Sequence, residues 1–324
     1  MTILLKELKK TLKKHYDVFL TSASYEKRCL SIMDAVNNVI DFNYKFVSLS
    51  IPHKDLMKEN LEIFKRNKFV IIEINNAEQV KTATNFIEHI GQVLNENPKA
   101  TFLVDITTFT KQTLLILLRI LRESLYESNQ IQFLYTPAEE YSIGLEYADK
   151  WLSRGVIKVN SILGFAGIIK PSNLYHLVIL MGYEVERAAA LINAYEPSKI
   201  SVGYARKDDS ISDAHYQINK LKYDELLSEF PYAESFEFSG TKILDCKQDI
   251  LKQVERYSNY NVVVSPMNNK ISTLSCALAA FDNDKIQLAI AIPAIYNHEN
   301  YSKPSNYCYV IDVSEFIKLH SPNR

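Results

Sequence analysis

Two polar segments in the first half of the chain carry side chains suited to binding an anion. They contain hydroxyl residues, one tyrosine and two basic residues, namely Ser22, Ser24, Tyr25, Arg28, Thr107, Thr108 and Lys111. Small hydroxyl residues just before a helix cap its first N–H groups, or leave those groups and the positive end of the helix dipole for an anion. Arginine and lysine add positive charge beside such a ligand. The pattern predicts a phosphate-binding site built without glycine.

The second half of the chain holds a related set of polar residues. They are Tyr183, Arg187, Ser265, Asn268, Asn269 and Lys270. Asparagine side chains favour turns and helix caps, and they also form hydrogen bonds with a base or a ribose. We therefore predict ligand-binding residues in both halves.

Three carboxylates lie in or beside these segments: Asp105, Glu26 and Glu184. If the chain is an enzyme, they are the candidates for acid–base catalysis, and the neighbouring arginines and lysines would stabilise charge. A structural interpretation stays open for the same residues. Glu26 with Arg28, and Glu184 with Arg187, can form ion pairs that hold helix to loop. The hydroxyl residues can equally be simple helix caps.

Apolar periodicity predicts strands that alternate with helices along the whole chain. In the first half we expect strands at 17–21, 44–51, 69–74, 101–106 and 131–136, and helices at 25–40, 56–65, 77–94 and 111–126. In the second half we expect strands at 174–181, 199–204, 233–238, 261–265, 285–292 and 307–313, and helices at 183–195, 211–230, 241–257 and 270–281. This alternation is typical of a parallel sheet covered by helices on both faces.

The spacing of charged residues indicates that the two halves are copies of one unit. Arg28 precedes Lys111 by 83 residues, and Arg187 precedes Lys270 by 83 residues. Each arginine follows a Tyr-Glu pair, and each lysine follows an apolar segment and a short polar turn. The alternative to a duplication is that the two halves are unrelated domains that share the same order of elements by chance.

We therefore expect an α/β fold of two tandem Rossmann-like domains that arose by internal duplication, each with a mainly parallel sheet. The expected domains are 1–150 and 172–324, joined by a linker over 151–171 that is rich in glycine. For the strand order 3-2-1-4-5, a ligand binds beyond the carboxyl ends of the first and fourth strands, where the order reverses. We also expect the domains to face one another across a pseudo-two-fold axis, with a shared cleft.

Composition limits the classes of partner. The net charge is −1, from 37 basic and 38 acidic residues, which argues against duplex nucleic acid and anionic membranes. No apolar run reaches the roughly 20 residues of a membrane span, and we expect no signal peptide. The 4 scattered cysteines indicate reduced, buried thiols in a cytoplasmic protein. The common cofactor motifs and metal-ligand spacings are absent, so we expect neither cofactor nor metal.

The segment Val104-Asp105-Ile106-Thr107-Thr108-Phe109-Thr110-Lys111 resembles the D-x-T-x-G-T-K element of CARF domains. CARF domains are Rossmann-like sensors of cyclic oligonucleotide messengers in prokaryotic immunity, and SAVED domains are similar to two fused CARF-like units. The chain departs from the motif at Phe109, which replaces the glycine, and 265–270 lacks both the aspartate and the Thr-Lys pair. The resemblance implies a sensor without an attached effector. Such a chain would be a separate sensor subunit, a messenger-degrading enzyme, or the partner of a separate effector protein.

Three functions follow as hypotheses. The first is binding of a nucleotide or nucleotide-like anion by a regulatory module, a second-messenger sensor in antiphage defence. The second is hydrolysis of a phosphodiester or N-glycosidic bond in the inter-domain cleft, and the third is a scaffold subunit of a defence complex. The second half has no counterpart of Asp105, which favours binding over catalysis, while the basic residues of both halves argue against idle sites.

Overall fold

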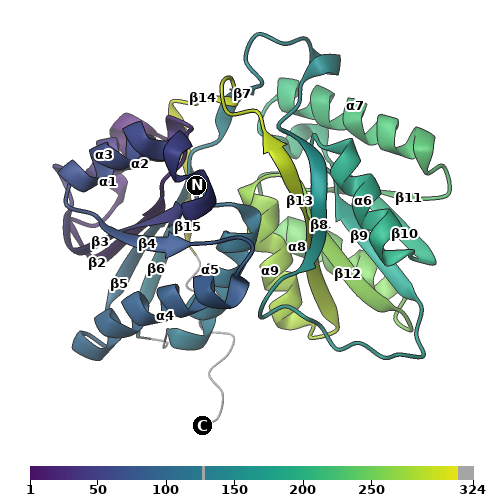
Figure 1. Cartoon of the computed structure of the whole chain (residues 1–324), viewed down its shortest axis with the longest axis horizontal. Helices are drawn as coiled ribbons and strands as arrows, with labels where there is room; N and C mark the ends of the chain where they lie inside the picture. The colour runs from purple at the N-terminus through teal and green to yellow at the C-terminus, as the bar shows by residue number, and fades with distance from the viewer. Residues whose placement is uncertain (126–127, 313–324) are drawn as a thin grey trace. The chain divides into compact units, whose positions relative to one another are not determined.

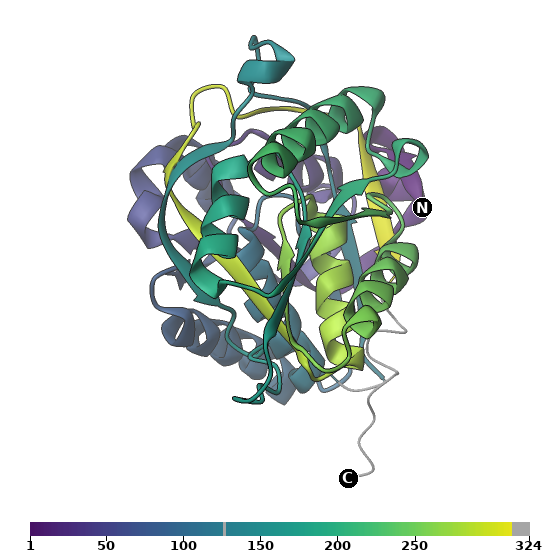
Figure 2. The ribbon, with the colours of Figure 1, turned by 90° about the vertical axis from the view of Figure 1, so that its right-hand side faces the viewer.

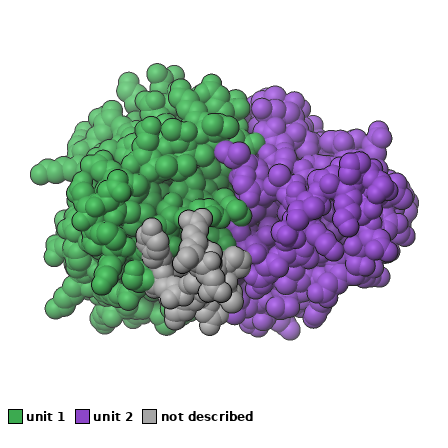
Figure 3. Space-filling view, turned by 90° about the horizontal axis from the view of Figure 1, so that it is seen from below, with its two compact units in different colours: residues 1–140, 302–324 green, residues 141–301 purple. Residues whose placement is uncertain are grey.

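The structure, a computed structural model, describes residues 1–125 and 128–312 and divides into two compact units. Unit 1 comprises Met1–Glu140 and the chain from Ser302 onward, and unit 2 comprises Tyr141–Tyr301 (Figure 3). Each unit is a mainly parallel sheet flanked by helices (Figure 1). The expected α/β class is therefore confirmed.

Five parallel strands form the centre of the unit 1 sheet, in the order β4-β3-β2-β5-β6. In chain order this is the 3-2-1-4-5 arrangement that the sequence analysis assumed. β15 pairs antiparallel with β6, and β1 pairs antiparallel with β15, so both extend one edge of the sheet. The strands are Thr2–Leu4 (β1), His15–Ser22 (β2), Asp41–Ser50 (β3), Val70–Ile74 (β4), Thr101–Asp105 (β5), Gln130–Tyr135 (β6) and Tyr307–Asp312 (β15).

Helices cover both faces of this sheet (Figure 1). One face carries α1 to α3 and the other carries α4 and α5, with bounds Leu8–Thr11 (α1), Arg28–Val36 (α2), Lys58–Arg66 (α3), Gln79–Glu96 (α4) and Lys111–Ser124 (α5). Phe19, Val47 and Leu103 of the central strands pack with Met33 of α2 and Phe64 of α3 in one buried cluster. Because side chains alternate along a strand, the residues between them face α4 and α5.

Unit 2 repeats the strand order, with parallel strands β11-β10-β9-β12-β13. β8 adds an antiparallel edge beside β13. α6 and α7 cover one face, and α8 and α9 cover the other (Figure 2). The elements are Ser153–Ser161 (β8), Tyr175–Leu180 (β9), Val185–Tyr195 (α6), Lys199–Ala205 (β10), Asp213–Glu229 (α7), Glu234–Phe238 (β11), Ile243–Arg256 (α8), Asn261–Pro266 (β12), Lys270–Asp282 (α9) and Ile286–Tyr296 (β13).

The unit boundaries differ from the expected domain boundaries in two places. The predicted linker over 151–171 contains β8, which belongs to the sheet of unit 2. After the end of unit 2 at Tyr301, the chain returns to unit 1. There β14 (Ser302–Pro304) pairs with β7 (Ala138–Tyr141), and β15 pairs with β6. The predicted ends of the helix at residue 126 and of the last strand at residue 313 lie outside the described residues.

A close contact between two loops of unit 2 makes Gly182 hard to replace. A Cβ atom at this position would lie 2.2 Å from the backbone oxygen of Met267. Because both atoms are held by backbone, we expect Gly182→Ala to lower the free energy of unfolding by about 1–3 kcal/mol. Trp151 is the one tryptophan of the chain and lies in unit 2, so its fluorescence during urea unfolding measures this loss.

Gly91 supplies the control for this substitution. It lies in α4, and a Cβ atom there would meet nothing within 4 Å. Gly91→Ala should leave unit 1 as stable as before or more so, since alanine favours a helix. An equally harmless Gly182→Ala would contradict the close contact between the two loops.

Candidate functional site

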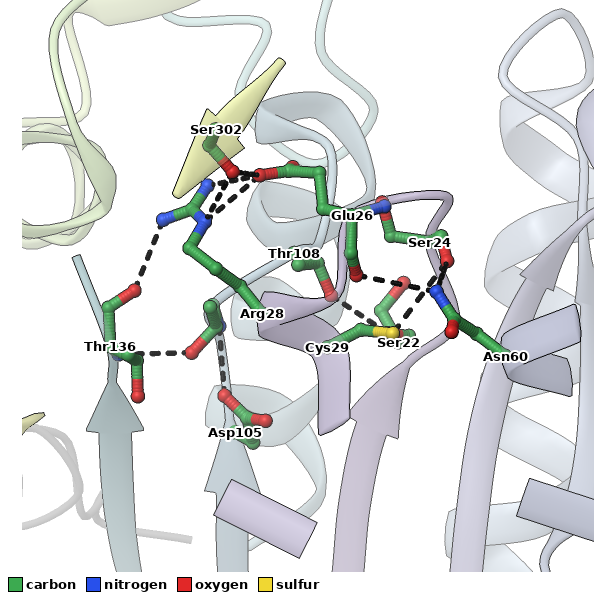
Figure 4. Close-up of polar contacts among 11 residues, drawn as sticks. Ser22, Ser24, Glu26, Arg28, Cys29, Asn60, Asp105, Thr108, Thr136 and Ser302 are labelled. Atoms are coloured by element: carbon green, nitrogen blue, oxygen red, sulfur yellow. Dashed lines mark hydrogen bonds and ion pairs between the residues drawn. The ribbon is translucent and has the colours of Figure 1, made fainter. Parts of the chain in front are cut away.

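The loops that follow β2 and β5 meet at the carboxyl edge of the unit 1 sheet (Figure 4). Thr108 Oγ1 donates a hydrogen bond of 2.7 Å to the backbone oxygen of Ser22. Thr110 caps α5, because its side chain accepts a hydrogen bond from the N–H of Thr113 at 3.2 Å. The structure therefore brings the two predicted segments together at the point where the strand order reverses.

The corresponding loops of unit 2 are joined in a similar way. The N–H of Met267 donates to the backbone oxygen of Leu180 at 3.0 Å, and the Asn268 amide donates to that of Met181 at 2.7 Å. Asn269 caps α9 by accepting the N–H of Ser272 at 2.9 Å. Both asparagines thus have structural partners at the positions predicted to bind a ligand.

Glu26 and Arg28 form a buried ion pair in unit 1. Arg28 Nη2 lies 2.6 Å from Glu26 Oε2, and Arg28 Nη1 donates to the backbone oxygen of Thr136 at 3.1 Å. Ser302 of β14 completes the group, because its hydroxyl donates to Glu26 Oε2 at 2.5 Å (Figure 4). The pair joins the start of α2 to β14 and to the end of β6, which agrees with the structural interpretation of these residues.

Unit 2 contains a matching pair, Glu184 and Arg187. Arg187 Nη1 lies 2.6 Å from Glu184 Oε2, and Arg187 Nε donates to the backbone oxygen of Ala291 at 2.8 Å. The Ser153 hydroxyl of β8 also donates to the Glu184 carboxylate. In both units, an arginine near the start of the helix that follows the first parallel strand thus binds a backbone carbonyl of the fifth parallel strand or of the next residue. A serine binds the glutamate of the same pair.

Asp105 is the most deeply buried carboxylate of the predicted site, with 1% of its surface exposed. Its Oδ1 accepts the N–H of Thr107 at 3.0 Å, and its Oδ2 accepts the hydroxyl of Thr21 at 3.2 Å. Burial raises the pKa of Asp105 to about 6, although these hydrogen bonds and Arg28 act in the opposite direction. Ser265 takes the corresponding place in unit 2, and its buried hydroxyl has no hydrogen-bond partner among the described residues.

The remaining predicted residues lie at the same edges. Ser24 is buried, and its hydroxyl accepts the N–H of Glu26 at 3.2 Å. Thr107 Oγ1 accepts the N–H of Thr136 at 3.0 Å. The predicted site residues that are only partly buried there are Tyr25, Glu26, Thr108, Lys111, Tyr183, Asn268, Asn269 and Lys270.

No protein-family model matches this chain, and the search of curated proteins also found no match. Any function proposed for the chain therefore rests on its own residues and their arrangement.

Two residues that hold the loops of the site in place were not predicted from the sequence. Asn60 of α3 donates to the backbone oxygen of Ser24 at 2.8 Å and so holds the loop after β2 (Figure 4). Asn76 holds the start of α5, because its Oδ1 accepts the Thr113 hydroxyl at 3.1 Å and its backbone oxygen accepts the Gln112 amide at 2.6 Å. Neither asparagine stands in a recognisable motif, so only the fold brings them to the site.

The structure also bears on the cysteines, on possible metal ligands and on possible membrane-spanning helices. All four cysteines are buried and free of disulfides, and burial raises the thiol pKa of Cys29, Cys246 and Cys308. Residues 1–125 and 128–312 contain no group of three His, Cys, Asp or Glu side chains that could hold a metal ion. Within the same residues, no helix combines the length and the apolar character needed to cross a bilayer.

Proposed function

We propose that this chain is a regulatory module that binds a nucleotide or nucleotide-like anion at the carboxyl edge of its parallel sheets. The hydrogen bond from Thr108 to Ser22 carries the proposal, because it joins the loops after the first and fourth strands at the switch point of the strand order. This point brings together capped helix starts, hydroxyl groups and a partly buried lysine. Such groups can bind an anion through hydrogen bonds and positive charge.

We also infer that the two units are tandem Rossmann-like copies of one ancestral unit. The common strand order, the capped helices after the fourth strand and the two Glu–Arg pairs support this inference. Chance would have to produce each of these similarities separately. The duplication agrees with the resemblance to fused CARF-like units, and we therefore propose a second messenger of antiphage defence as the ligand and a separate protein as the effector.

The contacts of the acidic residues favour binding over hydrolysis. Glu26 and Glu184 are buried against arginines, and Asp105 is buried under two hydrogen bonds. A general acid or base must reach its substrate directly or through one water molecule. Each of the three carboxylates is instead held by an arginine or by hydrogen bonds within its own unit, so we place them in the framework of the site.

The two lysines at the helix starts provide the test. We expect the double variant Lys111→Ala, Lys270→Ala to bind nucleotides roughly 10- to 100-fold more weakly, because a lysine at the start of the helix supplies a charged donor to the anion. Calorimetric titration with AMP, ATP and a cyclic oligoadenylate measures the affinity.

The control is the pair Lys65→Ala and Lys252→Ala, which removes exposed lysines from α3 and α8. It should leave the affinity unchanged and so exclude a general effect of net charge. The proposal fails if none of the three compounds binds the unaltered protein, or if both double variants bind as tightly as it does.

A further inference from the structure

Two buried serines of β3 lack hydrogen-bond partners at the edge where the proposed ligand binds. Ser48 is fully buried and Ser50 is 4% exposed, and neither hydroxyl has a partner among the described residues. A buried hydroxyl without a partner costs about 1–3 kcal/mol. Native proteins contain few such groups, and each calls for an explanation such as a bound ligand.

The alternation of β3 directs both serine side chains to one face of the sheet. Val47 and Leu49 pack into the cluster with α2 and α3. Ser48 and Ser50 therefore point to the opposite face, which α4 and α5 cover. This places the two free hydroxyls on the side of the sheet where α5 begins.

The start of α5 and the loop before it contact segments on both sides of β3. The loop before α5 is bound to the end of β2 through Thr108 and Ser22. The first turn of α5 is bound to Asn76, which follows β4, through Thr113. Since β3 lies between β2 and β4 in the sheet, these two contacts flank the carboxyl end of β3.

Unit 2 lacks these hydroxyls at the corresponding positions. The N–H of Ala23 donates to the oxygen of Ser48, and the N–H of Met181 donates to that of Gly203, so Gly203 corresponds to Ser48. Two residues on, Ala205 corresponds to Ser50.

An aromatic ring also fills this part of unit 2. A Cβ atom on Gly203 would lie 2.5 Å from the ring of Phe236, so the ring occupies the space of the missing side chain. In unit 1 the partner of Ser48 on the neighbouring strand is Ile72, whereas in unit 2 the partner of Gly203 on the neighbouring strand is Phe236. Lys242 of unit 2 is also paired with a carboxylate, because its Nζ lies 2.8 Å from Asp209 Oδ1.

We infer that unit 1 alone holds a phosphate group, free or part of a nucleotide, through the hydroxyls of Ser48 and Ser50 at the start of α5. This inference rests on the proposed function and assigns its anion site to one of the two units. The hydroxyls donate to phosphate oxygens, and the first N–H groups of α5 lack partners within the helix and add their dipole. Unit 2 then has a structural role at the equivalent edge.

The variant Ser48→Ala, Ser50→Ala tests the inference because it should move stability and binding in opposite directions. Removing two unpartnered hydroxyls should raise the midpoint of thermal unfolding of the free protein. The same change should weaken phosphate binding by about 10-fold or more, since hydrogen bonds to a charged group are lost. Calorimetry and thermal unfolding with inorganic phosphate, AMP and a cyclic oligoadenylate measure both effects, and Ser50→Ala alone serves if the double variant does not fold.

Thr136→Val is the matched control. Thr136 is also buried in unit 1 with an unpartnered hydroxyl, but it follows β6, which β5 and β2 separate from β3 in the sheet. Its replacement should raise stability and leave binding unchanged. Binding of inorganic phosphate as tight as that of AMP would indicate a free-anion site, and tighter AMP binding would indicate a nucleotide.

The outcomes separate this inference from the proposed function. If the unaltered protein binds a phosphate compound and the serine variant binds it equally well, the role of β3 is refuted and the proposed function stands. If no phosphate compound binds the unaltered protein, both are refuted. Loss of binding in the serine variant together with intact binding in Thr136→Val supports both.

Discussion

Replacing Arg28 by alanine will lower the free energy of unfolding by about 3–5 kcal/mol, because it leaves the Glu26 carboxylate buried without its cation. The same change removes the donors to the backbone oxygen of Thr136 and to the Ser302 hydroxyl. Lysine should not rescue the loss, since one ammonium cannot reproduce the planar fork of a guanidinium. A loss of this size is a large part of the stability of a typical domain, and it measures the cost of the unpaired Glu26 carboxylate, not the net contribution of the ion pair.

Hydrogen exchange of the α2 peptides in increasing urea measures this effect, because the only tryptophan lies in unit 2 and does not report on unit 1. Arg119→Ala is the control, since Arg119 forms an exposed ion pair with Glu123. It should change stability by less than about 1 kcal/mol. The double variant Glu26→Gln, Arg28→Met should be milder than Arg28→Ala, because it leaves no buried charge. An effect of Arg28→Ala no larger than that of Arg119→Ala would contradict the prediction.

Asp105→Asn will stabilise unit 1 at pH 7–8 by about 3 kcal/mol and will have no effect near pH 4. Burial raises the pKa of Asp105 to about 6, above its ordinary value of 3.8. The folded state therefore holds this proton more tightly than the unfolded state does. The resulting stabilisation is complete below pH 4 and is lost as the pH rises through about 6. Asparagine keeps the shape without the charge, because its amide oxygen can accept the N–H of Thr107 and its amide nitrogen can donate to the Thr21 hydroxyl, which reverses that hydrogen bond.

Denaturant midpoints from pH 4 to pH 8, followed by hydrogen exchange in unit 1, measure this dependence. Asp17→Asn is the contrasting control, because hydrogen bonds from Thr101 and Asn97 outweigh burial and hold the pKa of Asp17 below its ordinary value. That variant should lose stability at neutral pH. Parallel pH curves for the unaltered protein and Asp105→Asn would show that the carboxylate is not buried as described.

Most of the fold could be predicted because the apolar pattern is strong in the central strands. In β5, four of the five residues are buried, and a buried apolar run between two helical patterns indicates a parallel strand. The strands at the sheet edges are harder to predict. β8 has one buried residue among nine and no regular alternation of apolar and polar residues. Nothing in the segment at β15 indicates which of the two sheets it joins.

The candidate site was predicted by residue type but not by role. The sequence leaves Arg28 open to two interpretations, because its partners Thr136 and Ser302 are remote along the chain. Ser48 and Ser50 were missed for a related reason. They lie in a strand whose neighbouring residues are apolar, and only the packing of Val47 and Leu49 against α2 and α3 places their hydroxyls on the face of the sheet that α4 and α5 cover.

The return of the chain to unit 1 determines the order in which the two units can be completed during synthesis. Unit 2 is continuous, so all of it leaves the ribosome before β14 and β15 exist. At roughly 5–20 residues per second, β6 waits for on the order of 10–30 s with an open edge before β15 can pair with it. Throughout that interval β1 has no neighbour and Glu26 lacks Ser302. The nascent chain therefore presents a sheet edge that another chain could pair with, and the unit that begins first is finished last.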